Sequence, residues 1–393
     1  MDGMWADLLP VGRDGTTGGY RRHAWTPSDL TCREWFAGEA ARRGLDLVVD
    51  RNGNQWAWWG DPDADGPGVV SGSHLDSVPD GGAYDGPLGV VSAFAAVDLM
   101  REQGVVPARP LGVVSFTDEE GARFGIACAG SRLLTGALDA DRARRLTDAD
   151  GTTLAEAMRA AGHDPDQLGR DDETLRRVGT LVELHVEQGR GLVDAGAAVG
   201  VAHGIWPHGR WRLDLDGEAN HAGTTRLVDR DDPMLRLAAA VLSAREAATA
   251  RGAVATIGRV TVAPNGTNAI PSRVRAWLDA RGADEADVRA VVAAVAIAAG
   301  TEPVEESWTP LVAFDDHLRD RLADRLGGAP VLPTAAGHDA GILAGAGVEA
   351  GMLFVRNPTG VSHSPAEHAE TDDCHAGVTA LATVLVDLPG ARR

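Results

Sequence analysis

The feature that most restricts how this chain can fold is a series of short apolar runs, each accompanied by acidic or histidine side chains. The runs Val69–Ser73, Leu111–Phe116 and Leu181–Glu187 read as buried strands, and Gly86–Gln103 reads as a helix. Near-continuous apolar strands separated by helices indicate an α/β fold with a largely parallel sheet. Sheets of this kind bind ligands at the carboxyl edge, where polar residues that follow the strands would gather.

Five side chains along the chain carry nitrogen or oxygen atoms that suit metal ions: His74, Asp85, Glu120, His185 and His363. They lie in the segments GSHLDSVPDGGAYDGPLG, FTDEEG, ELHVEQG and GVSHSPAEH. Each motif alone has an ordinary alternative, such as an acidic helix start for Glu119 and Glu120, or a hydrogen-bonded core histidine for His185. Their position favours metal, because unpaired charge beside buried strands is costly and cations would neutralise it.

The chemistry of a two-metal site assigns roles to these side chains. The expected ligands form two sets that share Asp85 as a bridge, namely His74 with His185 and Glu120 with His363. Asp76 would accept a hydrogen bond from His74 and fix the tautomer of its imidazole. A water between two cations ionises near neutral pH, so metal-bound hydroxide would be the nucleophile. Glu119 would act as general base and carry the water proton to the leaving nitrogen.

Residues 207–309 show a different pattern, which predicts an inserted domain. The expected strands and helices are Arg210–Gly217, a helix from Asp232 to about Arg251, Ala253–Ala263, Arg273–Asp279, a helix over Asp284–Ala299, and Val304–Trp308. Their order, βαββαβ, is that of a ferredoxin-like α+β fold, and about 100 residues is a typical domain size. The chain then resumes α/β character, so we expect residues 1–206 and 310–393 to form one catalytic metal-binding domain.

Composition and charge limit the expected partners and location. The net charge of −20 argues against binding to nucleic acid, which needs clustered lysine and arginine. The three cysteines are far apart and imply no disulfide framework. The N-terminus has no signal-peptide pattern, and no apolar stretch reaches membrane-spanning length. We therefore expect a globular, cytoplasmic protein without a nucleic-acid or membrane partner.

The chain is similar, nearly end to end, to the ureido-hydrolysing (hydantoinase/carbamoylase) branch of the aminoacylase-type dinuclear metallopeptidases. The similarity rests on GSHLDSVPDGGAYDGPLGV, DEEGARFG, ELHVEQG, GEANHAGTT, PNGTNAIPS, GHDAG and GVSHSPAE. HVEQG favours this branch, because the equivalent ligand in the peptidases proper is usually acidic. The branch includes N-carbamoyl-L-amino acid hydrolases, allantoate amidohydrolases and β-ureidopropionases. The resemblance implies two divalent ions per subunit, Zn²⁺ or Mn²⁺, with Co²⁺ and Ni²⁺ as further candidates.

The resemblance also implies a substrate-binding set. Gln188 resembles the residue that contacts the ureido group, and His221 resembles the lid histidine that polarises the scissile carbonyl. Asn268 and Arg281 resemble the pair that grips the substrate carboxylate, for which an arginine fork has suitable geometry. Gly360 would offer backbone contacts close to the last metal ligand. In such enzymes the inserted domain serves as a lid and forms the homodimer contact.

Four residues depart from the family pattern or stand out beside it. Trp206 and His208 lie in the hinge segment GIWPHGRW, where relatives usually have smaller residues, and we favour a hinge-packing role for both. Arg226 stands where a proline is common. Arg356 is a further candidate for binding the acidic end of a substrate.

The leading prediction is a metal-dependent amidohydrolase that cleaves the C–N bond of a small ureido carboxylate. Allantoate and N-carbamoyl-L-amino acids are the main substrate candidates, and the products would include ammonia and carbon dioxide. One alternative is a deacylase of N-formyl or other short N-acyl L-amino acids. Another is a non-catalytic metal-binding homologue, which the intact set of five ligands and Glu119 opposes.

Overall fold

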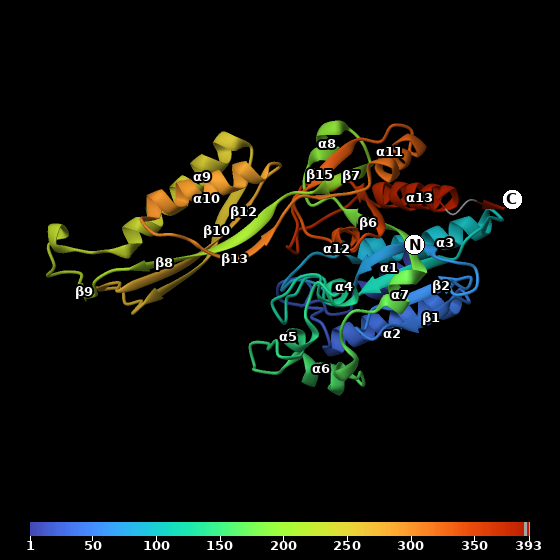
Figure 1. The fold of residues 1–393 in the computed structure, drawn as a ribbon, viewed down its shortest axis with the longest axis horizontal. Helices are drawn as coiled ribbons and strands as arrows, with labels where there is room; N and C mark the ends of the chain where they lie inside the picture. Colours follow the sequence, from blue (N-terminus) through green and yellow to red (C-terminus); the bar gives the residue numbers. More distant parts are fainter. Residues whose placement is uncertain (389–390, 393) are drawn as a thin grey trace. The chain divides into compact units, whose positions relative to one another are not determined.

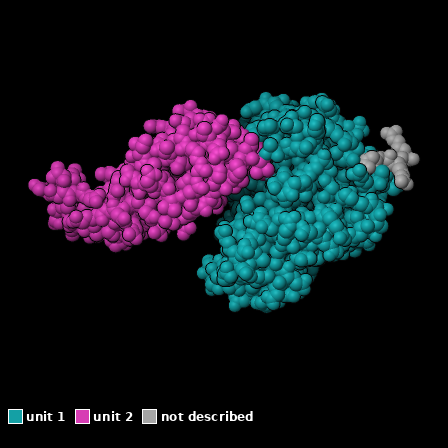
Figure 2. Space-filling model, in the orientation of Figure 1, with its two compact units in different colours: residues 1–203, 313–393 teal, residues 204–312 magenta. Residues whose placement is uncertain are grey.

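The computed structural model describes residues 1–388 and 391–392, and the chain divides into two compact units (Figure 1). Unit 1 contains residues 1–203 and 313–393, and unit 2 contains residues 204–312 (Figure 2). The domain boundaries predicted from the sequence lie between residues 206 and 207 and between residues 309 and 310. Each unit has its own apolar core.

The central sheet has nine strands in the order β1-β2-β5-β3-β6-β16-β7-β14, with β15 paired to β7. Its strands are β1 (Asp46–Val49), β2 (Gln55–Trp59), β3 (Gly68–His74), β5 (Leu111–Phe116), β6 (Val178–Val186), β7 (Val199–Ile205), β14 (Val312–Ala313), β15 (Val331–Thr334) and β16 (Glu349–Val355). The four central strands β5, β3, β6 and β16 pair in parallel. The pairs β1–β2, β2–β5 and β16–β7 are antiparallel. The prediction of an α/β fold with a largely parallel central sheet is confirmed, with antiparallel pairs toward its edges.

The helices of unit 1 bury the parallel strands, which is why those strands are apolar along their whole length. The helices are α1 (Asp2–Leu8), α2 (Pro27–Arg42), α3 (Pro87–Glu102), α4 (Ala129–Thr135), α5 (Ala140–Arg144), α6 (Leu154–Ala160), α7 (Asp172–Arg177), α8 (Gly191–Ala195), α11 (Asp316–Arg325), α12 (Asp339–Gly345) and α13 (Thr371–Asp387). Helix α3 contacts β3, β5, β6 and α13, and is buried on nearly all sides. A two-residue pair, β4 (Val106–Pro107) with β17 (Ala391–Arg392), lies outside the central sheet.

Unit 2 has the strand and helix order βαββαβ when two short strands, β9 and β11, are set aside; these two pair with each other. Its elements are β8 (His208–Asp216), β9 (Asn220–His221), α9 (Pro233–Arg251), β10 (Val254–Ala263), β11 (Ala269–Ile270), β12 (Arg273–Arg281), α10 (Glu285–Ala299) and β13 (Val304–Thr309). The four long strands form an antiparallel sheet in the order β10-β12-β8-β13. Helices α9 and α10 lie together on this sheet (Figure 1). The apolar core of unit 2 lies between these helices and the strands.

The burial pattern of β12 alternates, so one sheet face packs on the helices and the other carries charged residues. Arg273 pairs with Asp216 on that second face, and Arg275 pairs with Asp214.

Among the described residues of both units, no helix has the length and apolar character needed to cross a bilayer.

Candidate metal centre

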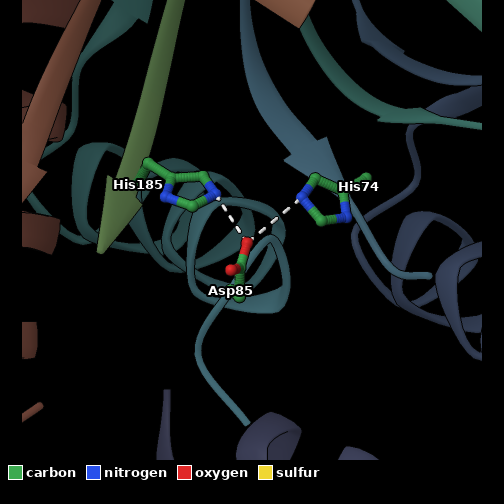
Figure 3. Close-up of side chains that lie close together, drawn as sticks. All are labelled: His74, Asp85 and His185. Carbon is green, nitrogen blue, oxygen red and sulfur yellow. Dashed lines mark ion pairs between the residues drawn. The ribbon is translucent and has the colours of Figure 1, made fainter. Parts of the chain in front are cut away.

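His74, Asp85 and His185 meet at the carboxyl ends of the parallel strands. His74 is the last residue of β3, and His185 is the last but one of β6. Asp85 lies in the loop that precedes α3, and its Oδ1 is 3.6 Å from His74 Nε2 and 3.2 Å from His185 Nε2 (Figure 3). All three side chains are buried. The strand order places the two histidines on neighbouring parallel strands, as the carboxyl-edge argument predicts.

The second oxygen of Asp85 faces a different set of side chains. His363 Nε2 lies 3.3 Å from Asp85 Oδ2 and 3.6 Å from Glu120 Oε2. The donor atoms of Asp85, Glu120 and His363 are close enough together to bind one ion, as are those of His74, Asp85 and His185. Asp85 is therefore common to both groups and directs one carboxylate oxygen to each.

The imidazoles of the buried group are oriented for binding a cation. His185 Nδ1 is 2.9 Å from the Val186 carbonyl oxygen, and His74 Nδ1 is 3.2 Å from the Asp76 carbonyl oxygen. A carbonyl oxygen only accepts, so each Nδ1 carries a proton, and in a neutral ring the Nε2 lone pair then points at Asp85. Two acceptors facing one another require a proton or a metal ion between them, and these residues fit a metal ion.

The electrostatics of the cluster lead to the same conclusion. Buried His185 Nε2 and Glu120 Oε1 have no hydrogen-bond partner among the described residues. Burial would raise the pKa of Asp85, but the three histidines that face its carboxylate, His185, His363 and His74, outweigh burial and hold that pKa well below its usual range. Burial and the nearby Asp85 charge raise the pKa of Glu120 to about 7. Hydrogen bonding to Asp85 is the main cause that raises the pKa of His363 to about 9. Negative charge is thus in excess here, as in a site that binds cations.

Glu119 lies beside the ligand candidates and is itself buried. Its Oε2 is 3.8 Å from His74 Nε2, and the thiol of Cys128 donates to its Oε1 at 3.1 Å. Burial raises the pKa of Glu119 well above its ordinary value. Glu119 is thus a buried carboxylate next to the ligand candidates that takes up a proton more readily than an exposed glutamate does.

Asp76 makes contacts beyond the one expected from sequence. Its carboxylate accepts hydrogen bonds from the backbone N–H groups of Glu119 at 3.1 Å and Glu120 at 3.0 Å. Its Oδ1 is 3.6 Å from His74 Nδ1, farther than its own carbonyl oxygen. Asp76 thus anchors the loop that carries the two glutamates as well as facing the histidine.

Three further residues around the cluster were not assigned a role from sequence. The Glu367 carboxylate accepts the backbone N–H groups of Tyr84 and Asp85, both at 2.9 Å, and a hydrogen bond from Ser362. The buried ring of His338 lies 4.6 Å from that of His185, and its Nε2 has no hydrogen-bond partner among the described residues. Glu367 and Ser362 lie in the motif GVSHSPAEH, and His338 lies in GHDAG. Their place in these motifs was the sequence signal that could have identified them.

Gln188 contacts the carboxylate of Asp85. Its Nε2 donates to Asp85 Oδ2 at 2.9 Å and to Ser362 Oγ at 3.3 Å, whereas its buried Oε1 has no partner in the described part of the chain. Gly360 has a φ of 70°, and an added Cβ would lie 2.5 Å from the Arg190 side chain. The Arg356 guanidinium forms a two-point pair with buried Asp373, which indicates a structural role for Arg356.

The residues predicted in unit 2 fall into two groups at opposite ends of its sheet. His221 in β9 and Asn268 beside β11 are adjacent, because Ala222 N–H donates to the Asn268 carbonyl at 2.9 Å. They lie beyond the Arg273 end of β12, whereas Arg281 closes its other end. The nine residues of β12 span about 27 Å at roughly 3.4 Å per residue. One copy of unit 2 therefore does not bring Arg281 next to His221.

Arg281 and the remaining singled-out residues have local partners. Arg281 donates to Asp279 through Nε at 2.7 Å and through a terminal nitrogen at 3.1 Å. His208 Nδ1 is 2.8 Å from the Trp206 carbonyl oxygen. Arg226 pairs with Asp229 on the surface. These contacts show how the side chains are held but leave the hinge-packing interpretation a prediction.

Comparison with known proteins shows the family to which the chain belongs. Residues 70–387 match the profile described as Peptidase family M20/M25/M40. The chain is 38% identical over 398 residues to N-carbamoyl-L-amino acid amidohydrolase of Geobacillus stearothermophilus, covering 96% of each protein. It is 33% identical to allantoate amidohydrolase of Escherichia coli, covering 94% of this chain and 93% of that protein. The crystal structure of a hydantoinase/carbamoylase family amidase from Burkholderia ambifaria superimposes with a TM-score of 0.82 at 32% identity, covering 99% and 96%. The protein belongs to the M20/M25/M40 family.

Proposed function

We propose that the protein is a metal-dependent amidohydrolase that cleaves a C–N bond of a small ureido or N-carbamoyl carboxylate. The observation that carries the proposal is the position of Asp85, whose two oxygens face two separate ligand groups. The similarity to an N-carbamoyl-L-amino acid amidohydrolase and an allantoate amidohydrolase supports the choice of reaction. Allantoate and N-carbamoyl-L-amino acids remain the main substrate candidates.

The side chains that would hold the ions are His74 and His185 for one, Glu120 and His363 for the other, with Asp85 shared. Imidazole is a ligand that suits Zn²⁺ and carboxylate is one that suits Mn²⁺, so this mixed donor set is compatible with either ion. When bound, such ions polarise a carbonyl group and lower the pKa of water toward neutrality. The centre is built in unit 1, so its assembly needs no residue from unit 2.

Glu119 would take a proton from the attacking water and deliver it to the departing nitrogen. Its carboxylate is buried next to His74, and the Cys128 thiol holds one of its oxygens so that the other points toward the centre. Transfer of that proton turns the leaving group into a neutral amine. The carbamate that remains would decay to carbon dioxide and ammonia.

Gln188 favours a ureido substrate over a simple acyl substrate. Its NH₂ group is engaged by Asp85 and Ser362, which leaves Oε1 as a buried acceptor without a partner. The terminal amine of a ureido group donates two hydrogen bonds, and an N-formyl or N-acetyl group has no such donor. A buried acceptor left without a donor costs about 1–3 kcal/mol, which would penalise the acyl substrates. The deacylase alternative is therefore disfavoured.

Two copies of the chain would contribute to each site. If both Arg281 and the pair His221 and Asn268 contact one small substrate, they must come from different copies, because β12 separates them by about 27 Å. Unit 2 carries apolar side chains suited to a homodimer contact: Leu235 and Leu242 on α9 are 71% and 63% exposed. The edge of β10 that pairs with no other described strand is a second candidate contact, since edge strands pair readily with other chains.

The first experiment measures ammonia and primary amine released from a panel by the Mn²⁺-loaded protein. The panel contains allantoate, several N-carbamoyl-L-amino acids, and N-formyl and N-acetyl amino acids. Ammonia from a ureido compound, absent with Glu119→Gln, is expected. Amine release from the acyl compounds alone would establish the deacylase, and no turnover of any compound would favour a non-catalytic homologue. Gln188→Leu should lose activity on the ureido substrate selectively.

A mixing experiment tests the shared site. His221→Gln and Arg281→Ala are each expected to be inactive, and both should still bind metal. After the two are mixed and allowed to exchange subunits, random pairing should restore about one quarter of the parental activity, because half the dimers gain one intact site of two. A mixture that stays inactive, with exchange verified by mass spectrometry, would contradict the shared site.

A further inference from the structure

The loop that follows β9 is built around the ring of His221. The Gly223 backbone N–H donates to His221 Nδ1 at 2.9 Å. A nitrogen that accepts this bond cannot itself carry a proton, so the ring is neutral and its proton lies on Nε2. His221 therefore presents an N–H donor on the side of the ring away from the loop, which is the form needed to stabilise developing negative charge on a carbonyl oxygen.

Gly223 leaves room for this contact. A Cβ at position 223 would lie 3.2 Å from His221 Cε1 and 3.5 Å from His221 Nδ1. Since carbon atoms in favourable contact are about 3.5–4.0 Å apart, a methyl group would require the ring or the loop to shift by a few tenths of an ångström, which would disturb the alignment of the ring with the backbone N–H. A glycine at position 223 thus leaves the His221 ring free to accept the hydrogen bond from the Gly223 backbone N–H.

Arg230 fixes the backbone on both sides of Gly223. Its guanidinium donates to the Ala222 carbonyl at 2.6 Å and to the Thr225 carbonyl at 2.9 and 3.1 Å. Thr225 in turn donates to the His221 carbonyl through its hydroxyl at 2.8 Å. Three charge-assisted bonds from one side chain hold a loop whose other side chains are largely exposed.

We propose that Gly223 and Arg230 are positioning residues that hold His221 in the Nε2–H tautomer and fix the direction of its N–H. The inference rests on the proposed role of His221 as donor to the scissile carbonyl oxygen. Neither residue touches the substrate; both act through the histidine. Arg226, four residues before Arg230, pairs with Asp229 alone in the described part of the chain and has a side chain that is 77% exposed, so it serves as a matched control.

Steady-state kinetics give the first test. Gly223→Ala and Arg230→Ala are expected to lower kcat by about ten- to hundredfold. This loss should not exceed the loss caused by removing one hydrogen-bond donor to the developing oxyanion outright. KM should change little, because the interaction develops in the transition state. Arg230→Lys, which keeps the charge but not the fork, should fall between parent and Arg230→Ala. Arg226→Ala should match the parent, and thermal unfolding and metal content should stay constant throughout.

The second test reads the tautomer without turnover. Long-range ¹H–¹⁵N NMR spectra of histidine-labelled protein distinguish protonated from unprotonated ring nitrogens, and His221→Gln identifies the signals of residue 221. The parent should show a proton on Nε2, and Gly223→Ala and Arg230→Ala should show a mixture. A proton on Nδ1 in the parent, or unchanged signals and kcat in Gly223→Ala, would overturn the proposal. Full turnover by His221→Gln would instead refute the proposed role of His221, while the spectra still decide the positioning.

Discussion

Replacing Gly86 by alanine should weaken metal binding as well as folding, and comparison with a second glycine variant should separate the two effects. Gly86 has a φ of 83°, and an added Cβ would lie 2.4 Å from Cε1, 2.5 Å from Nδ1 and 2.6 Å from Nε2 of His74. Favourable contacts need about 3.5 Å or more, so the ring or the loop must move by about 1 Å. Metal ligands tolerate about 0.2 Å of error in distance, so the displaced His74 would no longer complete its group.

The expected size of the effect follows from two separate costs. A positive φ alone costs a residue with a Cβ about 1–2 kcal/mol, and the ψ of −59° at Gly86 lies outside the left-handed helical region and adds to that cost. Displacement of a ligand adds a loss of metal affinity of at least about 100-fold, which corresponds to about 2.7 kcal/mol. Gly66 isolates the first cost, because its φ is 85° and an added Cβ would meet no atom within 4 Å.

The assay compares the two variants in metal binding and in unfolding. Metal affinity is measured by competition with a chelator, and the free energy of unfolding of the metal-free proteins by denaturant titration. Gly66→Ala should lose about 1–2 kcal/mol of stability but keep the parental affinity, whereas Gly86→Ala should lose both. Equal metal affinity in the two variants would refute the assignment of His74 as a ligand.

Other predictions concern the base, its anchor, a buried acid and the ions. Glu119→Gln should lower kcat by about 10²- to 10⁴-fold with unchanged metal content, and a parallel loss of metal would contradict its role as base. In Asp76→Asn, an NH₂ group replaces one of the two oxygens that accept the backbone N–H groups of Glu119 and Glu120, so two donors face each other. Metal affinity, measured by chelator competition, should fall by about 10- to 100-fold. An unchanged affinity would contradict the role of Asp76 as the anchor of this loop. Burial raises the pKa of Asp50 from 3.8 to about 6. The folded protein therefore keeps a proton that the unfolded chain loses, and stability falls by about 3 kcal/mol as pH rises through this window. The free energy of unfolding of Asp50→Asn, measured by denaturant titration, should not show this part of the fall with pH. Identical profiles of stability against pH for the parent and the variant would contradict the raised pKa of Asp50. Chelator treatment should abolish turnover, with recovery on adding Mn²⁺ or Zn²⁺; activity that survives verified metal removal would refute the two-metal proposal.

Much of the fold was readable because its signals are local. β5 has the predicted bounds, Leu111–Phe116, and β3 extends the predicted Val69–Ser73 by one residue at each end. Buried parallel strands are apolar throughout and are separated by helices, so composition alone marks them. Strands β7, β14 and β15 were not predicted, because they pair with neighbours that lie far away in sequence, and β14 and β15 have only two and four residues.

The sequence by itself determined which side chains could serve as ligands, because histidine and carboxylate residues in known motifs carry their chemistry with them. Only the tertiary structure decided how they are held. Glu367 supports Asp85 across 282 residues of chain, and the ring of His338 lies against that of His185 although 153 residues separate their numbers. The tertiary structure also separated Arg281 from His221, since a strand's length sets the distance between residues at its two ends. Chemical identity is local, whereas distances between residues remote in sequence arise only when the chain folds.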